Sequence, residues 1–342
     1  MTMVGRRRLL WVVGGTLLLL LPPLASLVGE PFAVSLFSRI LIYAIAAVSL
    51  DLLLGYGAMV SLGHAAFFGV GAYVVGILAL HASDGAPQGS WLLFLPGTNN
   101  ALVSWPLATI VSALVATAIG ALSLRTSGIY FIMITLAFAQ MLFYFFDSLQ
   151  AYGGDDGLSI WSRNDFPGLD LADDTTFYYV CFACLAMFLF ICQRLVNSRF
   201  GMVVRGCAQN ERRMRALGFP TYRYKLLCFA IAGAGAGLAG ALIANQTEYV
   251  SPALLHWTRS GELLVMVILG GMGTLIGPVL GAITLLLGED LLAIVTEYWQ
   301  LYLGPFLVLV VLTTRRGIYG LIVGRHDRDG RDSHNGQGDS RD

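Results

Sequence analysis

The stretch that decides the fold runs from Gly55 to Tyr73 and reads GYGAMVSLGHAAFFGVGAY. It is apolar almost throughout, yet it contains five glycines and one histidine, His64. Glycine loosens a helix and histidine can carry a charge, so both are unusual in a run that otherwise suits hydrocarbon. The run therefore predicts a membrane segment that either packs very closely or is interrupted.

The composition of the whole chain agrees with a membrane location. Of the 342 residues, 56% are hydrophobic and only 12% are charged, and the mean hydropathy is +0.71. A soluble domain of this length carries far more charge. The net charge is zero, so it gives no reason to expect nucleic acid as a partner. We predict an all-α, polytopic bundle of membrane helices.

Apolar stretches close to the ~20 residues that span a bilayer recur along the chain. We interpret the basic start, Arg6–Arg8, and the run after it as an uncleaved first span rather than a removed signal. The segment 261–276 is short and rich in glycine, which predicts a broken or re-entrant span. Residues 1–324 form one membrane domain in this interpretation, and the polar residues 325–342 a disordered tail. About ten spans are expected, near 9–28, 34–54, 59–80, 104–124, 129–147, 175–195, 226–246, 261–276, 278–296 and 300–323.

The loops differ sharply in charge. Residues 197–225 contain seven Arg or Lys and one acid, whereas residues 147–174 contain seven aspartates and one base. Loops rich in Arg and Lys stay in the cytoplasm, so 197–225 is predicted to be cytoplasmic and 147–174 to lie on the far side. Ten crossings then place both termini in the cytoplasm as well.

Three stretches place small residues at every fourth position. Spacing of four puts them on one face of a helix, where backbones can approach closely. Packing alone explains such a face, but glycine-rich, interrupted helices can also line a transport path, and both interpretations remain open. Gly55, Gly63 and Gly71 lie off the first stripe and are candidates for a broken backbone. The stripes are Gly57, Ser61, Ala65 and Gly69; Ala232, Ala236, Gly240 and Ala244; and Gly273, Gly277 and Gly281.

Few ionisable groups lie at apparent membrane depth, and Asp51 and His64 are the deepest. Such groups are costly in hydrocarbon and usually face a bundle interior. A histidine there can also make one structural hydrogen bond and do nothing more.

The segment 203–218, VVRGCAQNERRMRALG, is predicted to form a short amphipathic helix that Gly218 terminates. A basic helix of this kind can lie on anionic lipid. Its definite order of residues favours docking into a cytoplasmic partner instead.

The sequence offers no catalytic pattern. Lys225 is its single lysine and follows Tyr224, so no Gly-Lys of a phosphate-binding loop exists. We therefore predict a protein that is not an enzyme, with any ATP hydrolysed by a partner. The five cysteines are interpreted as small apolar residues, and no metal site is predicted.

Several blocks, taken together and in order, resemble permease subunits of branched-chain amino acid ABC importers, of the LivM type. They extend over most of the chain, from about residue 40 to residue 320. The blocks are LDLLLGYGAMVSLGHAAFFGVGAY (50–73), RTSGIYFIMITLAFAQM (125–141), YGGDDGLS (152–159), NSRFGMVVRGCAQNERRMRALGFPTYRYKL (197–226), GLAGAL (237–242) and SPALLHWTRSGELLVMVILGGMGTLIGPVLGA (251–282).

The resemblance implies a bacterial inner-membrane permease with two related halves that pairs with a second, related permease. Two cytoplasmic ATPase subunits would bind ATP and Mg, and a periplasmic binding protein would deliver substrate. The loop 197–225 would be the coupling loop that docks into an ATPase. Ala208 and Gln209 replace charges common in the family, and Asp51 replaces a common Asn. The docking motif maps onto Gly201, Arg205, Gly206, Asn210, Glu211, Ala216, Leu217 and Gly218.

We expect the chain to form half of the translocation path in an ATP-driven importer of branched-chain, hydrophobic amino acids. Importers of urea or short amides use similar permeases and are the alternative. An alternative from another class is a stand-alone proton-coupled carrier, with Asp51 and His64 as a proton relay. The residues expected to line the path are Asp51, Ser61, Gly63, His64, Phe67, Gly270, Gly271 and Gly273.

Overall fold

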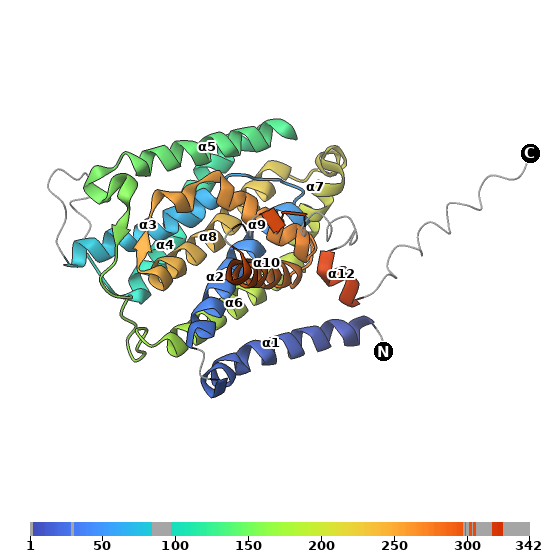
Figure 1. Ribbon diagram of the computed structural model, residues 1–342. Helices are drawn as coiled ribbons and strands as arrows, with labels where there is room; N and C mark the ends of the chain where they lie inside the picture. Colours follow the sequence, from blue (N-terminus) through green and yellow to red (C-terminus); the bar gives the residue numbers. More distant parts are fainter. Residues whose placement is uncertain are drawn as a thin grey trace, which may run out of the picture.

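The computed structural model describes residues 3–28, 31–83, 97–296, 298, 301–302, 304–305 and 317–323. The predicted tail 325–342 and most of the last predicted span, 300–323, lie outside these ranges. The described chain is a bundle of helices (Figure 1), as the composition predicts. The long helices are α1 (Met3–Val28), α2 (Pro31–Asp51), α3 (His64–Ser83), α4 (Ala101–Ser123), α5 (Ile129–Asp147), α6 (Asp174–Val196), α7 (Arg199–Ala216), α8 (Thr221–Thr247), α9 (Trp257–Gly270) and α10 (Gly277–Val295).

Short elements complete the described fold. A π-helical turn, η1 (Leu52–Tyr56), continues α2, and α12 (Gly317–Val323) is the last helix among the described residues. The remaining short elements are the 3₁₀ turns η2 (Gln150–Tyr152), η3 (Gly154–Asp156) and η4 (Pro252–Leu255) and the strands β1 (Leu158–Ser159) and β2 (Tyr249–Val250).

Seven helical segments of the described ranges are long and apolar enough to cross a membrane. They include α2 joined to η1 (Phe32–Tyr56), then α3, α4, α5, α6, α8 and most of α10. In the part of α1 whose side chains the structure describes, the apolar helix is Val13–Ala25. The predicted span 261–276 corresponds to α9, whose 14 residues end at Gly270. The predicted break in this segment is therefore present.

The centre of the bundle is α8, which packs against α2, α3 and α4. Its stripe residues Ala232, Ala236 and Ala244 are fully buried. A side chain at Gly240 would collide with the Phe68 carbonyl of α3, and one at Gly237 with Ser112 of α4. The second stripe is thus a true packing face, and its small residues let three backbones approach one another.

The first stripe is not a helical face, contrary to the prediction. After η1 the chain leaves the helix, and residues 57–63 are irregular until α3 begins at His64. A side chain at Gly57 would meet the Leu53 carbonyl, and Ala58 has a positive φ of 51°. The glycines therefore mark an interruption, because tertiary contacts here outweigh the regular spacing.

The third stripe is also interrupted, because Gly273 precedes α10 and has a φ of 74°. Helices α9 and α10 form an antiparallel hairpin in which a side chain at Gly270 would meet Gly277 and one at Gly281 would meet the Met266 carbonyl. The segment 271–276 is the tip of this hairpin.

The two loops of opposite charge lie at opposite ends of the bundle. In Figure 1, α7 and the start of α1 lie at the right, and the green segment after α5 lies at the left. There β1 pairs antiparallel with β2, with Leu158 opposite Val250. Arg163 forms an ion pair with Asp174 at 2.6 Å.

Candidate translocation site and docking segment

Asp51, the last residue of α2, contacts the tip of the α9–α10 hairpin. Its Oδ1 accepts a hydrogen bond of 2.8 Å from the backbone N–H of Gly273. The side chain is buried, with Asp51 only 1% exposed, and Oδ2 has no hydrogen-bond partner among the described residues. Asp51 therefore ties an interrupted segment of the first half of the chain to one of the second half.

The two backbones approach closely at this point. A side chain at Gly55 would overlap the Gly273 amide and the Asp51 carboxylate. The φ of 74° at Gly273 is a conformation that residues with a side chain rarely adopt. Gly317 of α12 contacts Gly271 of the same tip. Three segments that are distant in sequence thus meet around the tip.

His64 makes a separate contact. Its Nε2 lies 2.7 Å from Ser49 Oγ, and the Ser49 hydroxyl donates to the Ala46 carbonyl, also at 2.7 Å. Because the Ser49 hydroxyl proton is already used in the bond to Ala46, we assign the Nε2–H of His64 as the donor to Ser49 Oγ. The ring is fully buried. The sequence allows a single structural hydrogen bond as the role of His64, and this bond is of that kind. Asp51 and His64 therefore bond to different partners.

The other expected path residues surround these two contacts. Gly63 lies against the Thr135 carbonyl of α5, and its N–H donates to Ser61 Oγ at 3.3 Å. The Phe67 ring packs edge-on against His64. Ser61, Phe67, Gly270 and Gly271 are buried, and Gly273 is half-buried. The path candidates thus form two groups, one around the hairpin tip and one along 61–67.

Sequence reasoning missed two serines of this region. Ser49 positions His64, and Ser260 Oγ accepts a 2.8 Å hydrogen bond from the Ala65 N–H at the start of α3. Both are completely buried. A hydroxyl in an otherwise apolar helix is a signal for such a contact, because a buried hydroxyl needs a partner.

The docking segment α7 is two helical pieces rather than the one predicted. Its backbone is extended at Asn210 (φ −156°, ψ 97°), where the two pieces meet. Asn210 Oδ1 accepts a hydrogen bond of 3.0 Å from the Arg213 N–H, so it caps the second piece. A side chain at Gly206 would collide with Met214. The second piece therefore folds back onto the first.

Gly218 ends the second piece, as the sequence predicts. Its φ is 86°, its N–H bonds the Arg215 carbonyl at 2.9 Å, and the Phe219 N–H bonds the Met214 carbonyl at 3.2 Å. This pair of bonds is a Schellman motif, which requires a residue in the left-handed conformation.

The first piece of α7 is joined to α6. Gly201 packs against the carbonyls of Leu195 and Val196. The Arg205 guanidinium donates to the Val196 carbonyl at 2.8 Å. These predicted motif residues thus hold the segment to the bundle.

Glu211 begins the second piece and is held by the base of α8. Its carboxylate accepts hydrogen bonds from Lys225, from Arg215 at 2.5 Å and from Thr221 at 3.3 Å. Partial burial raises the pKa of Glu211, but hydrogen bonds and charge from Lys225 and Arg215 outweigh it, so the pKa lies below its usual value. Sequence reasoning singled out Lys225 but did not pair it with Glu211.

An apolar cleft connects α7 to the interrupted core. Leu52 and Tyr56 of η1 line it together with Val204 of α7 and Cys228 of α8. The η1 turn that lines this cleft directly follows Asp51.

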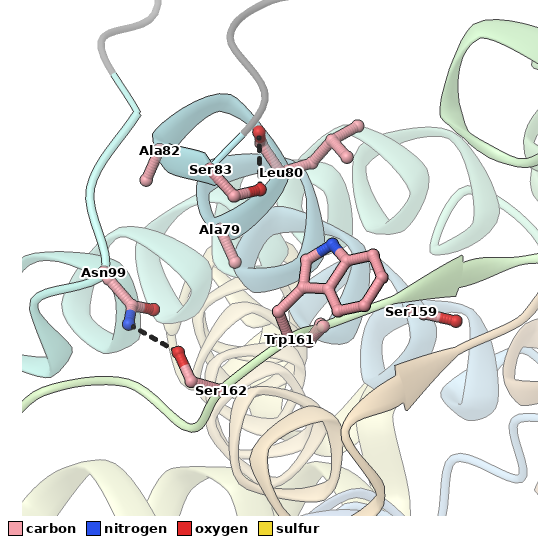
Figure 2. A pocket seen from close by; sticks show the side chains of 9 residues that line it. Ala79, Leu80, Ala82, Ser83, Asn99, Ser159, Trp161 and Ser162 are labelled. Carbon is pink, nitrogen blue, oxygen red and sulfur yellow. Dashed lines mark hydrogen bonds between the residues drawn. The ribbon is translucent and has the colours of Figure 1, made fainter.

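A cavity of about 230 Å³ lies at the opposite end of the bundle. Figure 2 shows the Trp161 indole beside it and Asn99 Nδ2 donating to Ser162 Oγ, at 3.2 Å. Trp161 is 79% exposed. The cavity is lined by Ala79, Leu80, Ala82, Ser83, Asn99, Ser159, Ile160, Trp161 and Ser162.

Comparison with known proteins matches this architecture to one family and several relatives. Residues 32–312 match the family described as branched-chain amino acid transport system / permease component. The high-affinity branched-chain amino acid transport system permease protein LivM of Salmonella typhimurium is 28% identical over 330 residues, which cover 88% of this chain and 74% of that protein. LivM of Escherichia coli K12 gives the same values.

A second type of relative also matches. LivH of Salmonella typhimurium, a permease protein of the high-affinity branched-chain amino acid transport system, is 24% identical over 294 residues, or 81% of this chain and 91% of that protein. No solved structure matches the chain.

The structure has several apolar helices, and their interrupted segments meet in the core. Together with these relatives, this architecture defines a multi-pass transport permease of the inner membrane. The family match spans most of the sequence, so the chain belongs to the family of branched-chain amino acid transport permease components. Its relatives are transport subunits and not enzymes.

Proposed function

We propose that this chain is one permease subunit of an ATP-driven importer of branched-chain amino acids. The docking segment is the observation that carries the proposal. It is an ordered pair of helical pieces that extends from the bundle and contacts η1 beside the hairpin tip. The sequence has no phosphate-binding loop for ATP. A docking segment that binds an ATPase subunit would transmit the conformational change of ATP hydrolysis to the translocation path.

The proposed assembly follows from this role. Relatives of both the LivM and the LivH type match the chain, which supports a second, related permease as its partner. Two cytoplasmic ATPase subunits would bind ATP and Mg, one of them at α7, and a periplasmic binding protein would deliver the substrate. The α7 end of the bundle and both termini would then be cytoplasmic, as the basic loop favours.

In this proposal the Asp51–Gly273 contact belongs to the closed state of the path. It joins the end of α2 to the hairpin tip, where Asp51 and Gly271 are buried and Gly273 is half-buried. Movement of α7 against η1 would separate the two segments and open the path toward the cytoplasm. Asp51 Oδ1 accepts a hydrogen bond from the tip, and a bond to a carboxylate contributes about 1.5–3 kcal/mol net, which is small enough for the contact to break.

Uptake into proteoliposomes tests the substrate class. The chain would be reconstituted with a second permease, ATPases and a binding protein from the same organism, with ATP inside for the ATPases. Radiolabelled leucine should accumulate, and excess isoleucine or valine should compete. Competition by urea or acetamide, with no effect of valine, would support the amide alternative.

A further inference from the structure

We propose that Glu211 is a positioning residue of the docking segment, and that the partner is contacted by a basic and apolar face beside it. The inference rests on the proposed function, since it assigns which residues of α7 meet the ATPase. The resemblance to known importers marks Glu211 itself as a central residue of the docking motif. In the structure, however, the Glu211 carboxylate accepts its hydrogen bonds from residues of this chain.

The Glu211 carboxylate is occupied from two sides. Oε2 accepts from Lys225, and Oε1 accepts from Arg215 and Thr221. The Arg215 Nε also donates to Thr221 Oγ1 at 3.2 Å, which closes the network. The side chain of Glu211 is 29% exposed and that of Lys225 only 18%. A partner cation that approaches this carboxylate would compete with Lys225 and Arg215 for it.

The helical period separates two faces of the second piece of α7. Glu211 and Met214 face α8 and the first piece, and both are partly buried. Residues four apart lie on the same face of a helix, so Arg212 lies beside Ala216, and Arg213 beside Leu217. These four residues are exposed, and Leu217 is 65% exposed. Phe219, 38% exposed, follows the Gly218 cap.

We name the exposed residues of this face the docking face: Arg212, Arg213, Ala216, Leu217 and Phe219. It offers two guanidinium groups and an apolar edge, and the described residues contain no carboxylate paired with Arg212 or Arg213. The complementary partner surface is an apolar cleft with carboxylates at its rim. We assign this cleft to the ATPase subunit, because α7 is the segment that contacts η1 and the interrupted core.

A charge exchange separates positioning from direct contact. The binding affinity of the purified ATPase subunits would be measured for the assembled pair of permeases in nanodiscs. The variants are Glu211→Lys, Lys225→Glu and the double variant that carries both changes. Glu211→Gln is the milder variant, because it keeps the shape of the side chain. Arg125→Glu is the control, since it reverses an exposed charge between α4 and α5, outside the docking segment.

Positioning predicts that each single reversal weakens ATPase binding at least tenfold and that the double variant recovers to within about threefold of the parent. Arg213→Glu should weaken binding tenfold both in the parent and in the double variant, and Arg125→Glu should leave it unchanged. A double variant as weak as Glu211→Lys, with Glu211→Gln equally weak, would overturn the inference and make Glu211 a direct contact. Parent permeases that bind no ATPase would refute the proposed function itself.

Discussion

The backbone N–H of Gly273 donates a 2.8 Å hydrogen bond to the Asp51 carboxylate across 222 residues of sequence. Gly273 lies in the non-helical tip of the α9–α10 hairpin, so its N–H is not used in a helical hydrogen bond, and Asp51 lies where α2 passes into η1. The contact therefore depends on the interruption at the tip and joins the two halves of the chain.

Replacing Asp51 tests this contact. Asp51→Ala removes the acceptor of the half-buried Gly273 N–H and with it a hydrogen bond to a carboxylate, which costs ~1.5–3 kcal/mol, so the purified protein should unfold at a lower temperature and uptake should fall severalfold. Asp51→Asn keeps an oxygen acceptor at the same place and should retain most of the stability. Thermal unfolding and leucine uptake of the three proteins measure both effects. Equal unfolding temperatures for Ala and the parent would contradict the role given to this bond.

A methyl group at Gly55 should force the two segments apart. Its Cβ would overlap the Gly273 backbone, which cannot rotate away as a side chain could. Such overpacking costs ~1–3 kcal/mol, so Gly55→Ala should lower stability and abolish most uptake. Gly261→Ala in α9 is the control, since nothing lies within 4 Å of its Cβ. It should be neutral or slightly stabilising, and a similar loss in both variants would show that the close approach is irrelevant.

The sequence was sufficient for the membrane bundle, the packing face of α8 and the Gly218 cap. Each of these depends on local composition or on regular spacing, which a single chain displays. The break in the glycine-rich segment 261–276 was predicted for the same reason, and α9 does end at Gly270.

The site was predicted less well, because its contacts join residues far apart in sequence. The spacing of Gly57, Ser61, Ala65 and Gly69 predicts a helical face, yet the chain is irregular from 57 to 63. Spacing cannot reveal that Gly63 must fit against Thr135, 72 residues later, or that Gly55 meets Gly273. Tertiary packing decides these positions. Asp51 and His64 were correctly chosen as buried groups, but their partners could not be inferred.

The Glu211 network predicts a pH dependence of the docking segment. The pKa of Glu211 is lower in the folded segment than its ordinary value of 4.5. Its stabilising contribution is therefore complete above pH 4.5 and is lost as the pH falls through the lowered pKa. Amide hydrogen exchange of residues 211–217, corrected for intrinsic rates, should speed up in this acid range. In Glu211→Gln the exchange should be faster at neutral pH and should not change further on acidification.

Ala58 offers a test of the irregular segment 57–63. Its φ of 51° is left-handed, which costs a residue with a side chain ~1 kcal/mol, and the residue is exposed. Ala58→Gly should raise the free energy of unfolding by ~0.5–1 kcal/mol with uptake unchanged. Chemical unfolding of the purified protein measures this. A destabilised variant would indicate that residue 58 adopts another conformation.

The central claim is that ATP hydrolysis by partners drives this permease, and the energy source of uptake tests it most directly. Proteoliposomes with the complete importer would be loaded with ATP or a non-hydrolysable analogue, with and without an imposed proton gradient. Leucine should accumulate only with hydrolysable ATP, at a rate indifferent to the proton gradient. Accumulation driven by the proton gradient in the absence of ATP would contradict the account and identify a stand-alone carrier.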